Sequence, residues 1–423
     1  MRELDKVIGY EKIKKEMYRI IDILKDPEKY RALGVTIPKG VLLNGEPGIG
    51  KTLLAKCFVK ESGRKAFVIR KDRPDGVFVD YIRETFEKAA EEAPSIIMLD
   101  DMDKFANEDS YHCDAEEYVT VQACIDDVKE KDVFVIATTN NIRDLPNSLI
   151  RHGRFDKTFR MRFPVNEDAQ QIISFYLRNK KVAEDIDVEE IARFSVGHSC
   201  ADLETVVNIA GMYAGYENKK AIGQEDLINA CLREFYSVSD NEERSAASYR
   251  RSAVHEAGHA VVAEYFHPGS VNFASVVAGG SGLVSRHKSE GGSEEFQNAE
   301  AEVMISLAGK AATELIRGET DMGTNADLHS AFKQVAHMLD NVSAYDFYSW
   351  CHGDETSTRV FDHLDEVKGA EMTRYYMKTK RILSQNRAFL EEMAEQLQEK
   401  KTLSYKDIAK IREKHLPEAK QAV

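Results

Sequence analysis

The segment GEPGIGKT at residues 45–52 constrains the fold of this chain more than any other feature. It matches the pattern GxxxxGK[ST], follows the apolar residues Val41 to Leu43, and precedes a helix-like stretch from Leu53 to Glu61. A glycine-rich surface turn would need neither the strand nor the helix. The succession of strand, loop and helix therefore predicts a phosphate-binding loop in an α/β sheet.

The residue types in this loop are those that a bound nucleotide requires. Gly45, Gly48 and Gly50 let successive backbone N–H groups turn toward phosphate. Lys51 is expected to reach the β- and γ-phosphate oxygens, and the Thr52 hydroxyl is expected to bind magnesium. ATP and Mg²⁺ are the expected ligands of this segment.

The length of 423 residues predicts two or three domains, since domains average about 150 residues. Short apolar strands at residues 40–43, 66–69, 95–99 and 133–137 alternate with helical stretches, which is typical of a parallel sheet. Helical periodicity dominates the later sequence, apart from a glycine-rich, β-like segment at residues 271–292. The predicted order is an α/β nucleotide-binding domain at 1–165, a helical lid at 166–238, a linker at 239–247 and a mainly α-helical catalytic domain at 248–423.

Two carboxylates follow the predicted strand at residues 95–99, at the sheet edge where open α/β folds bind ligands. We expect Asp100 to hold magnesium through its water shell, and Asp101 to polarise the water that attacks the γ-phosphate. A pair of aspartates after a strand often forms only a turn. The preceding phosphate-binding loop favours the catalytic interpretation.

Further polar groups follow the next strand. Asn140 is suited to sense or position the γ-phosphate, and the segment RHGRFD at residues 151–156 places Arg151 and Arg154 three residues apart. Two guanidinium groups from one loop can spread the charge of a phosphoryl-transfer transition state. Solvated surface arginines are the alternative, which the residues alone favour.

The second chemical motif is HEAGH at residues 255–259, inside a helix-like stretch from Ala253 to Tyr265. The spacing puts His255 and His259 on one helix face, where two neutral imidazoles can bind Zn²⁺ while Glu256 acts as general base on a metal-bound water. A helix with two hydrogen-bonded histidines is the alternative. Gly258 favours the zinc site, because a glycine inside a helix costs about 1 kcal/mol relative to alanine and indicates close approach of another segment.

A catalytic zinc ion needs a third protein ligand, and the residues alone do not select one. Several carboxylates of the C-terminal domain are candidates. They include Glu302, Glu314, Asp321 and Asp327.

Composition excludes several other classes of protein. A net charge of −14 disfavours nucleic-acid binding, which needs a basic face. Six cysteines without a CxxC pair indicate neither a disulfide framework nor a zinc ribbon. The apolar runs are strand-length, well below the roughly 18 residues that span a bilayer, so we expect no membrane segment and a cytoplasmic location.

Taken together, these motifs resemble the FtsH family of membrane-tethered AAA+ zinc proteases, from about Val7 to about Arg387. The resemblance rests on motifs that recur in the same order. They are residues 37–41 entering the loop, the loop itself, Asn140, the arginine segment at 151–156, Ala201-Asp202-Leu203 in the lid, and HEAGHA at 255–260.

The resemblance implies further roles. Arg151 and Arg154 would be fingers that reach the ATP of a neighbouring subunit, which implies a homo-hexamer, and Ile8 and Gly9 would contact adenine. Asp327, in the segment GTNADL at residues 323–328, would complete the zinc shell. The segment GGSGLV at 279–284 would be an edge strand that pairs with substrate backbone, with an ordinary glycine-rich hairpin as the alternative.

Three features depart from the family pattern. Asp101 stands where the family has glutamate, and a carboxylate drawn back by about 1 Å should slow water activation. At the family's pore loop the chain reads RPDGVFV at residues 73–79, so Phe78 is either a substrate grip or a core residue. N-terminal membrane segments are absent, either because the chain is a soluble relative or because it lacks its anchor.

The resulting hypothesis is an ATP-dependent zinc endopeptidase that threads protein substrates through a hexameric AAA+ ring and cuts them at the HExxH site. It requires Zn²⁺, ATP and Mg²⁺ and suits protein quality control. One alternative is an ATP-fuelled protein remodeller with a dispensable peptidase. Another is an energy-independent zinc peptidase with a slow ATPase.

Overall fold

The computed structural model describes residues 2–106, 115–151, 153–238, 244–280, 282–287, 296–319, 325–340 and 358–416. The sequence-predicted positions His152, Ser281, Asp321, Gly323, Thr324 and most of the predicted linker lie outside these ranges. The described residues form two compact units. Residues 1–182 and 196–212 make up the first, and residues 183–195 and 213–423 make up the second.

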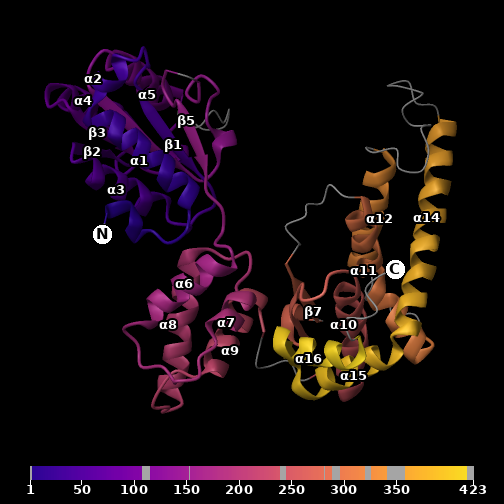
Figure 1. Cartoon of the computed structure of the whole chain (residues 1–423). Helices are drawn as coiled ribbons and strands as arrows, with labels where there is room; N and C mark the ends of the chain where they lie inside the picture. Colours follow the sequence, from indigo (N-terminus) through magenta and orange to yellow (C-terminus); the bar gives the residue numbers. More distant parts are fainter. Residues whose placement is uncertain are drawn as a thin grey trace. The chain divides into compact units, whose positions relative to one another are not determined.

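A five-stranded sheet is the centre of the first unit, with the strand order β2-β3-β4-β1-β5 and parallel pairing throughout. Its elements, most of which are labelled in Figure 1, are η1 (Glu3–Lys6), α1 (Glu11–Lys25), α2 (Pro27–Arg31), β1 (Gly40–Asn44), α3 (Lys51–Ser62), β2 (Lys65–Ile69), α4 (Asp75–Glu91), β3 (Ser95–Leu99), η2 (Met102–Lys104), α5 (Ala115–Asp127), β4 (Val133–Thr139), η3 (Ile142–Asp144), β5 (Lys157–Arg160) and α6 (Asn166–Leu177). This confirms the predicted parallel sheet.

Alternate residues of the central strands enter two separate apolar cores. On one face, strand residues such as Leu42 and Ile97 pack with α4 and α5. On the other face, their neighbours such as Val41 and Ile96 pack with α1 and α3. The strands are apolar on both faces because helices cover both, as expected for a parallel sheet.

The edge strand β5 was not predicted from the sequence. Of its four residues, KTFR, only Phe159 is buried, so the strand lacks the apolar run that marks β1, β3 and β4. Its pairing with β1 places the arginine segment beside the phosphate-binding loop strand.

Helices dominate the remaining sequence, as predicted. The elements are α7 (Val188–Phe194), α8 (Cys200–Tyr216), α9 (Gln224–Tyr236), α10 (Ala246–Phe266), β6 (Val271–Ser275), η4 (Ala278–Gly280), β7 (Leu283–Arg286), α11 (Phe296–Arg317), α12 (Asn325–Asp340), α14 (Thr358–Gln385), α15 (Arg387–Lys400), β8 (Thr402–Ser404) and α16 (Tyr405–His415). Helix α10 packs against α11 and α15, and an antiparallel sheet with the order β7-β6-β8 packs alongside it through β6 and β7.

Two helices of the predicted lid, α7 and α9, belong to the same unit as the β7-β6-β8 sheet. The ring of Phe273 in β6 stacks on Phe194 of α7, with centroids 4.4 Å apart, and meets Tyr236 of α9 edge-on at 4.9 Å. The Tyr236 hydroxyl donates a 2.9 Å hydrogen bond to the Phe194 carbonyl. This aromatic cluster joins the two helices to β6.

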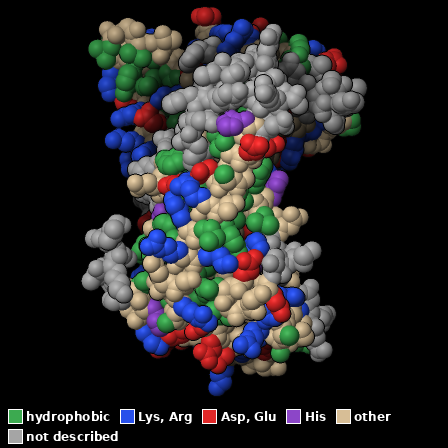
Figure 2. All heavy atoms as spheres, turned by 90° about the vertical axis from the view of Figure 1, so that its right-hand side faces the viewer, with side chains coloured by type: hydrophobic (Ala, Val, Ile, Leu, Met, Phe, Trp, Pro, Cys, Tyr) green, Lys and Arg blue, Asp and Glu red, His purple; other side chains and the backbone are tan. Residues whose placement is uncertain are grey.

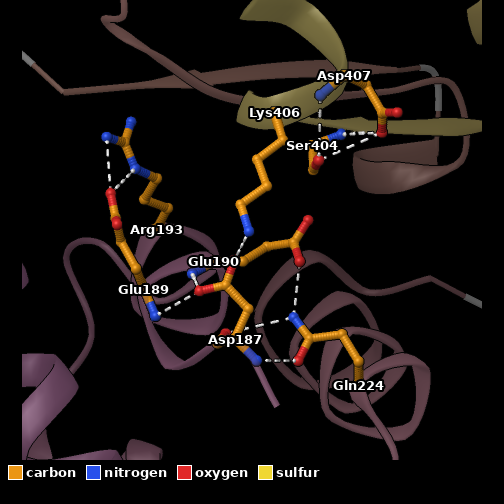
Figure 3. Close-up of polar contacts among 8 residues, drawn as sticks. All are labelled: Asp187, Glu189, Glu190, Arg193, Gln224, Ser404, Lys406 and Asp407. Atoms are coloured by element: carbon orange, nitrogen blue, oxygen red, sulfur yellow. Dashed lines mark hydrogen bonds and ion pairs between the residues drawn. The ribbon is translucent and has the colours of Figure 1, made fainter. Parts of the chain in front are cut away.

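Polar contacts also hold α7 to neighbouring elements of the same unit (Figure 3). Asp187 caps α7 by accepting hydrogen bonds from the backbone N–H groups of Glu189 and Glu190, and it forms an ion pair with Lys406 of α16. The Arg193 guanidinium lies 3.9 Å from the centroid of the Tyr405 ring. The aromatic cluster and these polar contacts together fix α7 against α16 and β6.

No helix among the described ranges is long and apolar enough to cross a membrane. On the face drawn in Figure 2, the Lys and Arg side chains of the described residues are interspersed with Asp and Glu. That distribution is unlike the single basic field that nucleic-acid binding requires.

Candidate functional site

The phosphate-binding loop connects β1 to the start of α3, as predicted. Gly48 and Gly50 have positive φ values of 77° and 94°, a conformation in which glycine carries no steric cost. The Lys51 ammonium donates hydrogen bonds to the carbonyls of Gly45 and Glu46, each 2.7 Å away, and to Asn140 Oδ1 at 2.8 Å. The structure therefore brings together the loop lysine and the predicted sensor, which come from neighbouring strands.

Asp100 lies directly behind this loop and is 1% exposed. Its Oδ1 accepts hydrogen bonds from the hydroxyls of Thr52 at 2.8 Å and Thr138 at 2.9 Å, and its Oδ2 forms an ion pair with Arg70. Burial alone would raise the pKa of Asp100, but the bonds from Arg70, Thr52 and Thr138 hold it below its ordinary value. The hydroxyl and the carboxylate are the hard oxygen ligands that Mg²⁺ prefers, so the residues present fit this ion.

Asp101 has a left-handed backbone conformation, with φ 55°. This turns its carboxylate toward a pocket that it lines with Lys51, Thr52 and Asn140, and its Oδ2 accepts a 2.8 Å hydrogen bond from Lys104. Asn140 is held from the same side by its backbone N–H, which donates to Asp103 at 3.1 Å. Gly48 and Gly50 line it as well, so six sequence-predicted residues share one pocket.

The predicted adenine-contacting residues lie in the segment before α1. Gly9 is buried with φ 78°, and the Tyr10 hydroxyl donates to the carbonyls of Ile49 at 3.1 Å and Arg162 at 2.7 Å. Ile8 is half-buried in this segment. Ile49 belongs to the phosphate-binding loop. The hydrogen bond from Tyr10 to its carbonyl therefore places the segment of Ile8 and Gly9 close to that loop.

The two predicted arginine fingers have different environments. Arg151 is exposed, as a finger must be. Arg154 is 1% exposed, forms a bidentate ion pair with Asp126 and also donates to the Ser148 carbonyl. This pairing holds the pKa of Asp126 at about 2. The expectation for Arg154 is not supported, because its guanidinium is buried and paired inside its own subunit and is not exposed to the ATP of a neighbour.

Phe78, at the position of the family's pore loop, is fully buried. Its ring meets Phe105 edge-on at 5.3 Å, within the core between the sheet and α4. The structure therefore decides between the two interpretations of Phe78 in favour of a core residue.

The HEAGH helix brings the second site together. His255 Nε2 lies 3.1 Å from His259 Nε2 and 3.1 Å from Asp327 Oδ2, and His259 Nε2 lies 3.4 Å from the same Oδ2. Ligand atoms about 2.0–2.2 Å from one tetrahedral zinc ion lie about 3.3–3.6 Å apart. The three side chains from α10 and α12 thus converge at nearly the separation that a shared zinc ion needs, and they form the one such cluster found among the described residues.

The other ring nitrogen of His259 fixes the tautomer. His259 Nδ1 lies 2.7 Å from the Ile305 carbonyl, an acceptor, so Nδ1 must carry the proton. In the neutral imidazole, Nε2 then carries a lone pair that points toward Asp327 and His255. A lone pair aimed at a carboxylate and at a second imidazole is unfavourable unless a cation lies between them, so the residues fit a zinc ion.

The alternative third ligands have other partners. Glu302 forms a bidentate ion pair with Arg286, at 2.6 Å for one of its two contacts. Glu314 is bonded by Lys310, Tyr376 and Lys380, which overcome its burial and hold its pKa at about 2. Of Glu302, Glu314 and Asp327, Asp327 is the carboxylate that lies next to the two histidines.

Sequence reasoning missed Gly309, which makes room for the imidazoles. A Cβ atom at this position of α11 would lie 2.5 Å from both Cε1 and Nε2 of His255 and 2.5 Å from Nε2 of His259. Gly258 lets α11 approach α10 closely, because a Cβ at this position of α10 would lie 2.6 Å from the Ala308 carbonyl. The predicted close approach at Gly258 is confirmed, and a second glycine in the helical pattern of residues 296–317 was the available signal for Gly309.

Gly309→Ala should therefore weaken zinc binding, by at least about tenfold, because the added methyl group displaces both imidazoles from their converging positions. Gly215→Ala in α8, where a Cβ would meet nothing within 4 Å, is the matched control. Zinc affinity is measured by competition with a chromogenic chelator. Equal zinc affinity in Gly309→Ala and the control would show that α11 can move away without disturbing the site.

Glu256 lies next to the three converging side chains and is 7% exposed. Burial raises its pKa to about 7. A Cβ on Gly282 would lie 2.4 Å from Glu256 Oε1, so the chain entering β7 passes directly over this carboxylate. Within the described sheet, β7 pairs with β6 alone, so its other edge has no partner strand among the described residues. The chain that enters this strand is the one that contacts Glu256.

Comparison with known proteins matches three segments of the chain in order. The model of the ATPase family associated with various cellular activities (AAA) matches residues 41–163, the AAA+ lid domain matches residues 185–229, and peptidase family M41 matches residues 242–411. Together these segments include both sites described above.

Curated relatives match along most of the chain. ATP-dependent zinc metalloprotease FtsH 2 of Sphaerobacter thermophilus is 34% identical over 79% of this chain and 54% of its own length. The FtsH proteins of Aster yellows witches'-broom phytoplasma and Thermus thermophilus are 30% and 29% identical over 96% of this chain, and over 63% and 69% of their own lengths. The chain thus spans roughly half to two thirds of these relatives. The three domains in this order, together with relatives of one kind along nearly all of its length, show that the chain belongs to the FtsH family of AAA metalloproteases.

Proposed function

We propose that this chain is the ATPase and peptidase part of an ATP-dependent zinc endopeptidase. The observation that carries the proposal is the convergence of His255, His259 and Asp327 beside the buried Glu256, in one chain with a complete phosphate-binding loop. The names of its relatives, ATP-dependent zinc metalloproteases, support Zn²⁺, ATP and Mg²⁺ as its cofactors.

At the peptidase site, His255, His259 and Asp327 would hold the zinc ion, which supplies Lewis acidity to a bound water and to the scissile carbonyl. Glu256 would take a proton from the attacking water and pass it to the leaving amine. The free edge of β7 would pair with the substrate backbone, so that the peptide runs past Glu256 in extended form.

At the nucleotide site, Lys51 and the loop N–H groups would bind the phosphates, and Thr52 and Asp100 would hold the magnesium. Asp101 would orient the attacking water and Asn140 would position the γ-phosphate. Ile8 and Gly9 would line the adenine pocket. The exposed Arg151 would reach the nucleotide of the next subunit in a homo-hexamer, whose ring would thread unfolded protein toward the peptidase sites.

A folded, tagged protein substrate tests this proposal. The chain, with assembly verified, should degrade it with zinc, magnesium and ATP, and should leave it intact when ATP is replaced by ADP. An unfolded casein-like substrate that stays intact under the first condition would overturn the proposal.

Two observations favour a second candidate, a zinc peptidase that does not depend on ATP. Phe78 is buried in the core and is not available as a substrate grip, and Asp101 is one methylene shorter than the family's glutamate. In this case the folded substrate would be degraded equally with and without ATP. The same experiment therefore distinguishes the two candidates.

The short Asp101 side chain leads to a prediction of its own. Asp101→Glu should raise the rate of ATP hydrolysis several-fold, because a longer carboxylate reaches the attacking water better while the charge is kept. Its left-handed conformation favours aspartate over glutamate, so the variant should also unfold at a slightly lower temperature. Phosphate release and thermal melts measure the two effects. An unchanged or lower hydrolysis rate would mean that the backbone at Asp101 already compensates for the shorter side chain.

A further inference from the structure

Arg70 lies at the proposed magnesium site. The parallel pairing of β2 with β3 sets Ile69 opposite Leu99, so the residues that follow each strand, Arg70 and Asp100, are neighbours across the sheet edge. The Asp100 N–H also donates to the Ile69 carbonyl, 3.0 Å away, which holds the two chain segments together at this point. The Arg70 guanidinium then bonds Asp100 Oδ2.

The ion pair between Arg70 and Asp100 balances the negative charge of a buried carboxylate. Asp100 is 1% exposed, and a buried carboxylate is costly without a positive partner. Its Oδ1 is bonded by the neutral hydroxyls of Thr52 and Thr138, and Arg70 supplies the cation at Oδ2. The Arg70 side chain is 56% exposed, so it reaches into the site from the solvent side and is free to leave it.

We propose that Arg70 is the internal counterion of Asp100 when no nucleotide is bound, and that the magnesium ion of the incoming nucleotide displaces it. The inference rests on the proposed nucleotide site and adds a residue to it. Arginine and Mg²⁺ compete for one carboxylate, so Arg70 raises the magnesium concentration that nucleotide binding requires.

The Arg70 side chain can leave Asp100 without moving the rest of the connection from β2 to α4. Lys71, the next residue, forms a 2.9 Å ion pair with the buried Glu117 of α5, and its ammonium lies 4.7 Å from the centroid of the Phe78 ring. Arg73 stacks on Tyr81 of α4, 3.8 Å from the ring centroid. The Lys71 ion pair with the buried Glu117 thus anchors the connection from β2 to α4 independently of Arg70, and the partly exposed Arg73 stack is not required for this, so the release of Arg70 leaves the connection in place.

A magnesium titration of nucleotide binding tests the inference. With the full chain and a fluorescent ADP analogue, the free Mg²⁺ concentration at half-maximal binding should fall by about five- to tenfold in Arg70→Ala, because magnesium no longer displaces an arginine. Arg70→Gln, which keeps most of the side-chain length without the charge, should behave likewise. Arg73→Ala removes a positive charge from the same connection and should bind as the wild type does.

Thermal melts give a second measurement, made first without nucleotide and then with it. In EDTA, Arg70→Ala should melt at a lower temperature than Arg73→Ala, because Asp100 has lost its counterion, and saturating Mg²⁺ with ADP should stabilise Arg70→Ala by more than it stabilises the wild type. An unchanged or higher magnesium midpoint in Arg70→Ala would overturn the inference while leaving the nucleotide site intact. If the wild-type chain bound no nucleotide at any magnesium concentration, the proposed nucleotide site would fail, and the inference with it.

Discussion

Glu256→Gln should abolish peptide cleavage and leave zinc binding unchanged. The substitution removes the general base, whose loss costs about 10²–10⁴-fold in rate, without altering a side chain that converges on the metal position. Glutamine has nearly the shape of glutamate, so the close contact with Gly282 is kept. Cleavage of an unfolded substrate and metal analysis of the same preparation measure the two effects.

Asp327→Asn is the counterpart to this variant. An amide is a poorer zinc ligand than a carboxylate, so zinc affinity should fall by at least about tenfold, together with peptidase activity. ATP hydrolysis should persist in both variants, because its residues lie in the other unit. Zinc retained at wild-type affinity in Asp327→Asn would remove Asp327 from the zinc shell, and Glu302 or Glu314 would then have to leave the ion pairs in which the structure places them.

Lys51→Ala should eliminate ATP hydrolysis and weaken nucleotide binding by about 10- to 100-fold. The ammonium would make charge-assisted hydrogen bonds to the phosphates, and each such bond contributes about 1.5–3 kcal/mol. Its removal also leaves the acceptors Gly45 O, Glu46 O and Asn140 Oδ1 without their present donor. Nucleotide fluorescence and phosphate release are the measurements.

Lys56→Ala, an exposed lysine on the same helix, is the matched control and should retain both properties. Zinc content should be normal in both variants. The pair formed by Lys51→Ala and Glu256→Gln also separates a protease from a protein remodeller, since a remodeller would keep its function in Glu256→Gln and lose it in Lys51→Ala. ATP hydrolysis at the wild-type rate in Lys51→Ala would contradict the assignment of the nucleotide site.

Local pattern was sufficient to predict most of the α/β unit. Strands β1, β3 and β4 are buried along most of their length and form continuous apolar runs, which is why the sequence revealed them. Strand β5 has one buried residue and helix α7 spans only seven residues, so neither carries a repeating pattern. Both are held by partners distant in sequence, β1 in one case and β6 in the other, and such contacts leave little local trace.

The same distinction applies to the sites. The spacing of His255 and His259 is local to one helix turn, and the helix places them as that spacing predicts. Asp327 comes from another helix, and many carboxylates shared its sequence character, so only family resemblance selected it. The local motif was misleading for Arg154. Its partner Asp126 lies 28 residues away, and nothing in the segment RHGRFD indicates that ion pair.

The aromatic cluster of Phe194, Tyr236 and Phe273 determines where the chain can be cut. A truncated protein beginning at Arg244 would lose α7 and α9 and leave the Phe273 ring open to water on the face that they cover. Such newly exposed aromatic surface promotes aggregation. A truncation beginning at Ala183 keeps both helices with the β7-β6-β8 sheet but also carries residues 196–212, whose contacts lie in the first unit, so the two units interleave in sequence and a single cut divides one of them.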